Sequence, residues 1–189
     1  NLLIQASEQM SLIYRAQRHA NWKQTRAAIE KAGDALRLEM FARYYGPWDD
    51  LAENRSFFGD AKMPAGAGFY PTDLTKEAFD AYLAKNPAEK AALTSPYTIV
   101  VRDGAKLKAI PYSVAFKTEL TQAAKLLNEA AAITTNASLK KFLTLRARAF
   151  LTDDYFESEL AWMDLEGTPI EVAIGPYEVY TDRLVGQKT

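Results

Sequence analysis

The sequence contains no cysteine and only one histidine, His19. Without cysteine the chain can form neither a disulfide nor a zinc ribbon, and it has no thiol nucleophile. A catalytic zinc site usually takes two or three histidines, or histidine with a carboxylate, so we do not expect this chain to assemble a histidine-based metal site by itself. His19 lies in "YRAQRHANW", beside Arg15 and Arg18, and we expect its side chain to be solvated or to face a partner.

Long apolar runs and an excess of one charge are also missing. No apolar run approaches the roughly 18–20 residues that span a bilayer. The net charge is −1, with 23 Lys and Arg against 24 Asp and Glu. This balance argues against nucleic-acid binding through phosphates and against a polybasic membrane patch. We therefore expect a soluble protein, cytoplasmic or periplasmic, with neither nucleic acid nor a membrane as partner.

The remaining composition is that of an ordinary globular protein. The 189 residues are 48% hydrophobic and 25% charged. A chain of this length can bury about 70% of the surface that its unfolded form exposes, which allows a substantial core. No shift in composition marks an internal boundary, so we treat residues 1–189 as one region. In this region 1–95 is helical with a long loop, and 96–189 holds a hairpin, two helices and terminal strands.

The first half of the chain carries helical patterns around one irregular stretch. Apolar residues recur at helical spacing through residues 1–45, with a break near Asn21. Residues 46–73 are rich in glycine and proline, which favours a loop. Thr75 is expected to cap a short helix that ends before Asn86-Pro87.

The second half begins with the clearest hairpin pattern. Residues 98–102 and 106–110 flank an Asp103-Gly104 turn. Ser113 is expected to cap a long alanine-rich helix, and Asn136 or Ser138 to begin the next. The stretch "TPIEVAIGPYEVY" predicts a strand, a Gly-Pro break and a second strand. The fold class is therefore α+β, mainly helical with a few short strands.

Two motifs suggest ligand binding, but local structure explains them more simply. The acids of "LTDDYFES" could bind a divalent cation, but they lack the spacing of an EF-hand loop. A helix start capped by Thr152 or Asp153 is the favoured alternative. The glycines of "PAGAGFYP" are not followed by the GK[ST] sequence of a phosphate loop, so we expect only loop geometry. The nearby aromatic residues are expected to pack together.

The last predicted strand carries the strongest candidate site. If residues 177–182 are extended, Glu178, Tyr180 and Asp182 share one face. A tyrosine hydroxyl can donate to a developing oxyanion, and a carboxylate can hold a free amino terminus by a charge-assisted hydrogen bond. On the residues alone, a solvated strand face is the commoner explanation for such alternation.

Several unusual strings occur in one order along the chain. They are "YGPWDDLAENRSFF", "PAGAGFYPTDLTKEAFDAYL", "LTSPYTIVVRDG", "AIPYSVAF", "FLTDDYFESELAWMDL" and "PIEVAIGPYEVYTDRLVG". Together they resemble the amino-terminal half of bacterial members of the dipeptidyl peptidase III family of zinc metallopeptidases. The resemblance runs from about Leu38 to Gly186, and the last string is the most specific.

The resemblance implies roles for individual residues. Tyr180 matches the family's active-site tyrosine, which bonds the substrate near the scissile peptide and helps to stabilise the oxyanion. Glu178 matches a residue that holds the substrate's free amino terminus. Asp182 and Gly186 also match, and we expect them to have a structural part.

The resemblance also implies what this chain lacks. In the family, zinc is bound by the two histidines of an HExxGH helix and by a glutamate from a later helix, and neither motif occurs here. We therefore expect a partial domain of a two-lobed metallopeptidase, with no metal ligand of its own. Zinc is expected in the full-length parent, outside this chain, on a carboxy-terminal lobe that is this chain's partner.

The resemblance implies that this chain is a fragment of a larger enzyme. The parent is expected to be a zinc-dependent exopeptidase that releases dipeptides from peptide amino termini. This chain would contribute the substrate-binding and oxyanion-stabilising wall, with Tyr180 catalytic and Glu178 substrate-binding, and would be inactive alone. The alternative is a non-catalytic peptide-binding or scaffolding domain.

Overall fold

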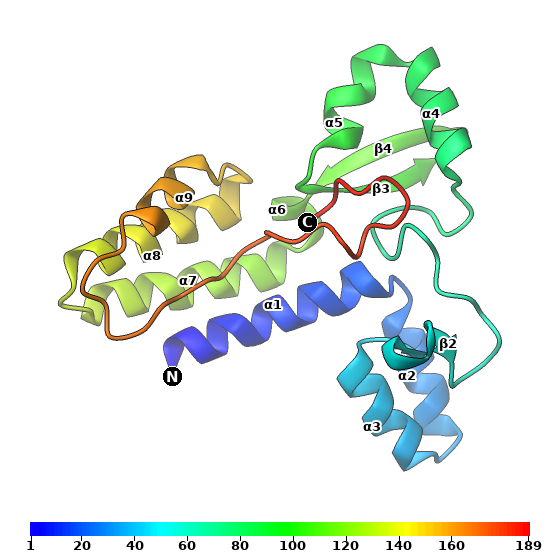
Figure 1. The fold of residues 1–189 in the computed structure, drawn as a ribbon, viewed down its shortest axis with the longest axis horizontal. Coiled ribbons are helices and arrows are strands. Elements are labelled where there is room, and N and C mark those ends of the chain that lie inside the picture. Colours follow the sequence, from blue (N-terminus) through cyan, green and yellow to red (C-terminus); the bar gives the residue numbers. More distant parts are fainter. The chain divides into compact units, whose positions relative to one another are not determined.

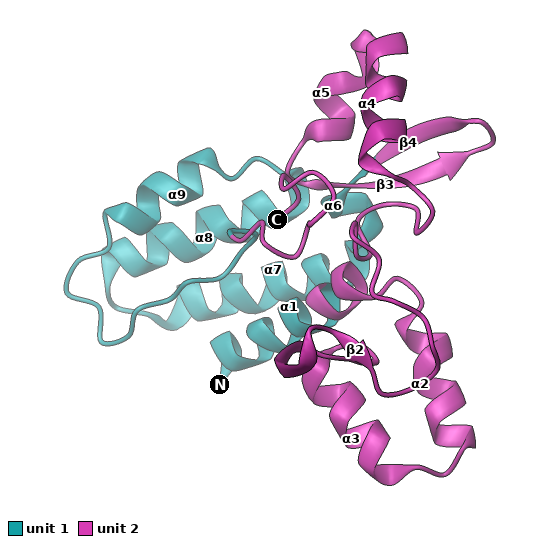
Figure 2. Ribbon diagram, turned by 45° about the vertical axis from the view of Figure 1, so that its right-hand side comes forward, with its two compact units in different colours: residues 1–13, 110–177 teal, residues 14–109, 178–189 magenta.

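The computed structural model describes all 189 residues, and the chain forms two compact units (Figure 2). Unit 1 consists of residues 1–13 and 110–177, and unit 2 of residues 14–109 and 178–189. None of the helices is long and apolar enough to cross a lipid bilayer. The fold is mainly helical, with two small two-stranded sheets, which confirms the predicted α+β class.

Unit 1 is helical. Its helices are the first part of α1 (Leu2–Arg18), α6 (Tyr112–Ala115), α7 (Lys117–Ile133), α8 (Ala137–Thr152) and α9 (Phe156–Met163). The helices α7 and α8 lie side by side and are joined by a short connection (Figure 1). Both helices turn apolar residues toward this contact at the spacing expected of one helix face. The buried set includes Leu120, Ala123, Leu127, Phe142, Leu143, Ala147 and Phe150.

Unit 2 contains the rest of α1, two helices that follow it and two short hairpins. The first group is α2 (Trp22–Lys31), α3 (Ala35–Tyr44), β1 (Trp48–Asp49), the 3-10 turn η1 (Asp50–Ala52) and β2 (Arg55–Ser56). The second group is α4 (Lys76–Lys85), η2 (Pro87–Glu89), α5 (Lys90–Thr94), β3 (Thr98–Asp103) and β4 (Lys106–Pro111), the last reaching into unit 1. β1 pairs antiparallel with β2, and β3 lies beside β4.

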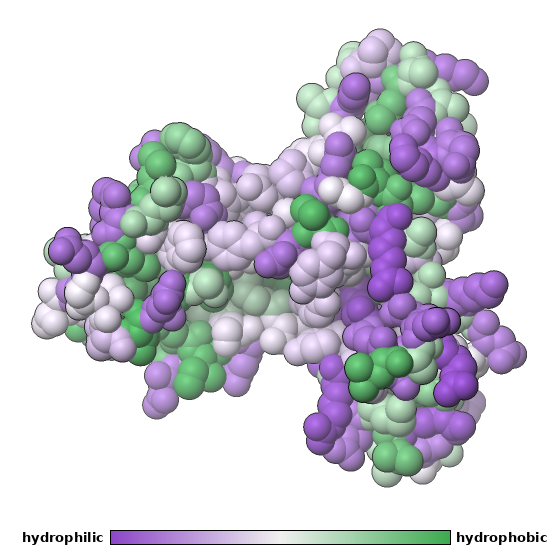
Figure 3. All heavy atoms as spheres, in the orientation of Figure 1, coloured by the Kyte–Doolittle hydropathy of each residue, from purple (hydrophilic) through white to green (hydrophobic).

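The surfaces over α2 and α3 and over α9 differ in how their apolar groups are arranged. On the face shown in Figure 3, green groups over α2 and α3 are separated by purple ones (lower right). The helix α9 differs, because Phe156, Leu160 and Met163 are 67%, 42% and 74% exposed. These residues are spaced four and three positions apart, so they share one face of the helix.

Several local predictions are confirmed at the level of single hydrogen bonds. The Thr75 hydroxyl accepts from the backbone N–H of Ala78, which caps α4, and α4 ends at Lys85 before Asn86-Pro87. The Asn136 side chain accepts from the Leu139 N–H and caps α8. The hairpin of β3 and β4 turns at Gly104, whose φ is +61°. In each case a residue with a strong local preference sits where that preference is needed.

The glycine-rich loop is also explained by packing. A Cβ atom on Gly68 would overlap the carbonyl oxygen of Ala16, and the Gly68 N–H donates to the Gln17 carbonyl at 2.6 Å. The loop therefore lies directly on the backbone of α1, where only glycine fits. Trp48, Phe69 and Tyr70 are 2%, 1% and 3% exposed, so these aromatic residues are part of the packed core. The Trp48 ring packs against His19 and the Tyr70 ring against Phe79.

Two predicted helix caps are wrong. Ser113 lies inside α6, and its N–H and hydroxyl both donate to the Asp153 carboxylate. Thr152 is the last residue of α8, and Asp153 follows it with a left-handed φ of +58°. Asp153 therefore holds α6 instead of beginning α9. The pattern of acids did not reveal this, because the partner lies 40 residues away.

The two terminal strands predicted from residues 168–180 are not present. Residues after α9 form no strand, and the N–H groups of residues 170–179 donate no backbone hydrogen bond. Alternation in the sequence is a strand signal only where a neighbouring strand is available to pair. Neither hairpin pairs with this segment, so it stays irregular.

Candidate functional site

Glu178 and Tyr180 lie on an exposed part of the terminal segment. Tyr180 is 69% exposed and Val179 is 41% exposed, and Glu178 is exposed as well. Asp182 is only 3% exposed, so the predicted common face of Glu178, Tyr180 and Asp182 is wrong. The reason is a turn, in which the Asp182 N–H donates to the Val179 carbonyl at 3.0 Å. A turn breaks the two-residue alternation of an extended strand.

The Asp182 carboxylate is the centre of the loop that follows. It accepts five hydrogen bonds of 3.0–3.1 Å, four from backbone N–H groups and one from a tyrosine hydroxyl. The donors are the N–H groups of Leu184, Val185, Gln187 and Lys188 and the hydroxyl of Tyr70. A buried carboxylate satisfied in this way fixes the backbone around it. Asp182 thus has the structural part that we expected.

A second set of contacts holds the same loop from its far end. The Lys188 side chain is fully buried, and its Nζ donates to the carbonyls of Leu93 and Ser95 and to the Thr98 hydroxyl at 2.7–2.8 Å. Burial lowers the pKa of Lys188 to about 8, although the Asp182 charge nearby acts in the opposite direction. The first residue after the turn is also fixed, because the Arg183 N–H donates to the Ala65 carbonyl at 3.0 Å. Tyr180 therefore lies two residues before a loop that is held by many hydrogen bonds.

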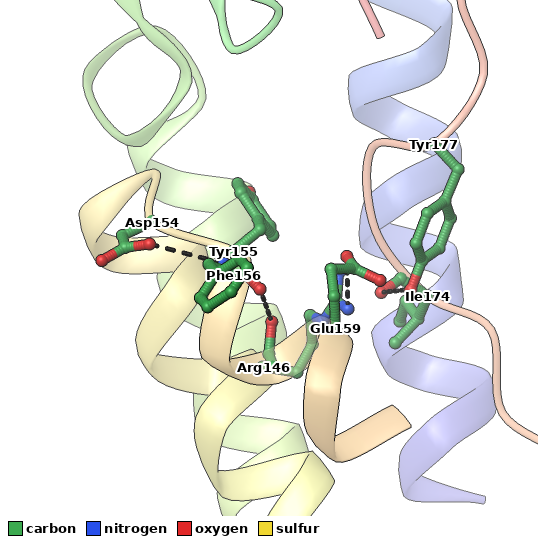
Figure 4. A network of polar contacts seen from close by, with 8 residues as sticks. Arg146, Asp154, Tyr155, Phe156, Glu159, Ile174 and Tyr177 are labelled. Atoms are coloured by element: carbon green, nitrogen blue, oxygen red, sulfur yellow. Dashed lines mark hydrogen bonds and ion pairs between the residues drawn. The ribbon is translucent and has the colours of Figure 1, made fainter. Parts of the chain in front are cut away.

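On the other side of Glu178, the segment is held to α8 in unit 1. Arg146 is fully buried, and its Nη2 donates to the Glu159 carboxylate at 2.8 Å. Its guanidinium carbon lies 5.3 Å from the Tyr177 ring centroid, and burial raises the pKa of the Tyr177 phenol. Figure 4 shows Arg146, Glu159 and Tyr177 as one group. Gly175 has φ +149°, and a Cβ there would overlap Arg146, so the backbone approaches the guanidinium closely.

The residues of this chain do not fit a zinc site. No group of three or more His, Asp or Glu side chains is placed to hold a metal ion. The single imidazole is engaged elsewhere, because His19 Nε2 lies 2.8 Å from the Thr25 hydroxyl and its ring packs edge-on against Trp48 at 4.8 Å. His19 is half-buried, so it is not fully solvated, which was one of the two positions that we expected, and burial lowers its pKa.

Sequence reasoning missed the residues that support the site. Tyr70 lies 112 residues from Asp182, and Arg146 lies 31 residues from Tyr177. Tyr70 is in a loop and Arg146 is in a helix, and both segments carry other strong signals. The only sequence signal for this support was Arg146 itself, which lies on the apolar face of α8 among Phe142, Leu143 and Phe150. A charge in such a place needs a partner in the folded chain.

Comparison with solved structures accounts for the whole chain. Dipeptidyl-peptidase III from Caldithrix abyssi matches with a TM-score of 0.95 and 45% identity, over 99% of this chain. The chain matches one part of dipeptidyl-peptidase III. The same enzyme from Corallococcus sp. strain EGB matches with a TM-score of 0.89 and 38% identity, again over 99% of this chain. In each case the chain spans 36% of the dipeptidyl-peptidase III structure, about a third of its length.

A curated plant protein shares the same region. "Nudix hydrolase 3" of Arabidopsis thaliana is 28% identical over 218 residues, which covers 89% of this chain and 28% of the plant protein. The matched region is little more than a quarter of the plant protein. The match therefore does not show that this region carries the hydrolase activity in the plant protein's name. No known protein-family model matches the chain.

Proposed function

We propose that this chain is the substrate-binding wall of a dipeptidyl peptidase. The observation that carries the proposal is the match to two dipeptidyl-peptidase III structures over 99% of the chain, at 45% and 38% identity. Because each match covers almost the whole chain, it includes the exposed segment with Glu178 and Tyr180. The proposal also rests on the exposure of both side chains beside a hydrogen-bonded loop.

Each side chain has a distinct task in this proposal. The Tyr180 hydroxyl donates a hydrogen bond to the carbonyl oxygen of the scissile peptide as negative charge develops there. The Glu178 carboxylate accepts from the ammonium group at the substrate's amino terminus. Holding that terminus at a set position makes the enzyme cut after the second residue. Asp182 does not touch the substrate in this scheme, and it acts by fixing the loop next to Tyr180.

The nucleophile lies outside the chain in this proposal. Zinc, when bound by the rest of the parent, would supply the activated water and polarise the carbonyl. The residues present here bind and orient the peptide and provide one oxyanion donor. The partner of this chain is therefore the remaining part of the same polypeptide.

The test is the substitution Tyr180→Phe in the full-length enzyme. Losing one oxyanion donor is expected to lower kcat about 10- to 1000-fold with little change in KM, because the hydroxyl acts mainly in the transition state. The measurement is steady-state hydrolysis of a dipeptidyl reporter substrate. Tyr14→Phe, in α1 and outside the terminal segment, is the matched control and should leave kcat within about twofold.

Two outcomes would contradict the proposal. An unchanged kcat for Tyr180→Phe would remove the catalytic role of this residue. Peptide binding without hydrolysis by the full-length polypeptide would instead favour the alternative, a non-catalytic peptide-binding domain.

A further inference from the structure

Arg183 is a cation without an acidic partner at the edge of a cavity. It is exposed, and no carboxylate lies within ion-pair distance of its guanidinium. The cavity has a volume of about 500 Å³. Its charged lining comprises three basic and two acidic residues, which are Arg55, Lys62, Arg183, Glu53 and Asp60.

The guanidinium is held in place by an amide. With the Asn54 side chain oriented to satisfy both of its ends, its oxygen accepts from Arg183 Nη1 at 2.9 Å and Nη2 at 3.3 Å. Its nitrogen then donates to Asp50 at 3.1 Å, and Asp50 forms an ion pair with Arg18. Arg18 is only 6% exposed, so this series of contacts ends in the packed part of unit 2. A neutral amide orients Arg183 but leaves its positive charge uncompensated.

The backbone that carries Asn54 is unusual. Glu53 and Asn54 have φ values of +54° and +59°, two consecutive non-glycine residues in the left-handed region. Such conformations are costly, and they persist where the surrounding contacts require them. Here they place the Asn54 amide against Arg183. The Arg183 backbone is fixed separately by its bond to Ala65.

We propose that Arg183 binds a carboxylate of the peptide substrate, on the carboxyl side of the bond that is cut. This inference rests on the proposed function and names the substrate class more closely. Arg183 is three positions after Tyr180, so their Cα atoms lie within about 11 Å of each other. A carboxylate one or two residues beyond the scissile carbonyl is about 4–7 Å further along an extended peptide. An arginine fork matches a carboxylate with two parallel hydrogen bonds.

The carboxylate has two chemical sources that the experiment separates. It is the free carboxyl terminus of a tetrapeptide, or an acidic side chain in a longer peptide. The probes are tetra-alanine with a free carboxylate, tetra-alanine amide, and Ala-Ala-Ala-Asp amide. Acetate is the fourth probe, because it tests the guanidinium without any peptide recognition.

The measurement is binding to the 189-residue chain, followed by nuclear magnetic resonance and calorimetry. Tetra-alanine acid is expected to bind about tenfold more tightly than its amide, the usual effect of a charge-assisted hydrogen bond. The aspartyl amide should recover this preference if side-chain carboxylates are also accepted. Acetate should shift the Arg183 Nε–H resonance more than that of any other arginine.

Four variants make the result specific. Arg183→Gln should abolish the acid-over-amide preference, and Arg183→Lys should keep part of it. Tyr180→Phe should leave the preference unchanged, because it acts on the scissile carbonyl. Arg43→Gln is the matched control, since Arg43 is an exposed arginine of the same unit, 73% exposed in its side chain and outside the cavity.

The outcomes separate this inference from the proposed function. Equal binding of acid and amide, unaffected by Arg183→Gln, would overturn the role of Arg183 and leave the peptide-binding wall intact. If no peptide bound but acetate shifted Arg183, the peptide-binding proposal would fall, and with it the role of Arg183 toward a substrate carboxylate. If neither peptide nor acetate bound, both would be overturned.

Discussion

Asp182 and Lys188 show how single buried charges organise the site loop. Asp182 accepts five hydrogen bonds, and Lys188 donates three from a fully buried ammonium group. Burying a charge is unfavourable unless its hydrogen bonds are satisfied. In this loop both charges are satisfied, so residues 182–188 have one well-defined conformation beside Tyr180.

Lys188 makes the stability of the chain depend on pH in the alkaline range. Its pKa is lowered from 10.5 to about 8 in the folded chain, so between these values the unfolded chain binds more protons. The free energy of unfolding should therefore rise with pH through this window, by up to about 3 kcal/mol from this group. The measurement is urea unfolding at pH 7.5 and pH 10.5, comparing the wild type with Lys188→Met.

The comparison isolates Lys188 from the tyrosines that also ionise in this range. The stability difference between wild type and Lys188→Met should grow by about 1–3 kcal/mol in favour of the wild type as pH rises. Lys90→Met, at an exposed lysine of α5, should show no such change. A difference that stays constant with pH would mean that burial does not lower the pKa of Lys188.

At the scale of elements, the capping residues of α4 and α8 differ in the further hydrogen bonds that they form. Thr75 makes one capping bond, to the Ala78 N–H at 3.1 Å. Asn136 makes one to the Leu139 N–H at 2.8 Å, and its Nδ2 also donates to the carbonyls of Glu166 and Gly167 at 2.9 and 3.1 Å. Asn136 therefore ties the segment after α9 to the start of α8.

This difference predicts unequal effects of removing the caps. Thr75→Ala should lower the free energy of unfolding by about 1 kcal/mol, and Asn136→Ala by about 2 kcal/mol, since further hydrogen bonds are lost. Asn136→Asp keeps the acceptor and loses the donor, so it should fall between Asn136→Ala and the wild type. Urea unfolding at pH 7 measures all three. Equal losses for Thr75→Ala and Asn136→Ala would show that the contacts to residues 166–167 contribute nothing.

The terminal strands were predicted wrongly because a strand needs a neighbouring strand to pair with. The β3–β4 hairpin was predicted correctly because both strands and their Asp-Gly turn are adjacent in sequence. The segment "PIEVAI" has comparable strand character, but no strand of this chain pairs with it. Strand formation depends on a neighbour, whereas helix formation uses bonds within the segment itself.

At the scale of the whole molecule, the chain passes between its two units three times. The changes fall after residues 13, 109 and 177, within α1, within β4 and between Tyr177 and Glu178. No loop composition marks the first two positions, since regular elements continue through them. The third lies between the Arg146 contacts of Tyr177 and the exposed pair of Glu178 and Tyr180.

The match to about a third of dipeptidyl-peptidase III leads to a prediction about activity. We expect the 189-residue chain alone to show no hydrolysis of a dipeptidyl reporter substrate and no bound zinc, because its residues do not fit a zinc site. Native mass spectrometry with metal analysis provides the measurement. A 21.1 kDa species without zinc is the expected result. Hydrolysis by that species, with one zinc bound, would contradict the proposed division of tasks.

The sequence by itself determined the main helices, the hairpin and the caps at Thr75 and Asn136, and it indicated Glu178 and Tyr180 as candidate site residues. These features depend on neighbours within a few residues, or on a string specific enough to be recognised. Only the tertiary structure decided that Asp182 turns inward, that Asp153 holds Ser113, and that Arg183 faces a cavity without an acidic partner. The physical reason is that a buried or oriented charge depends on partners far along the chain, which local patterns do not specify.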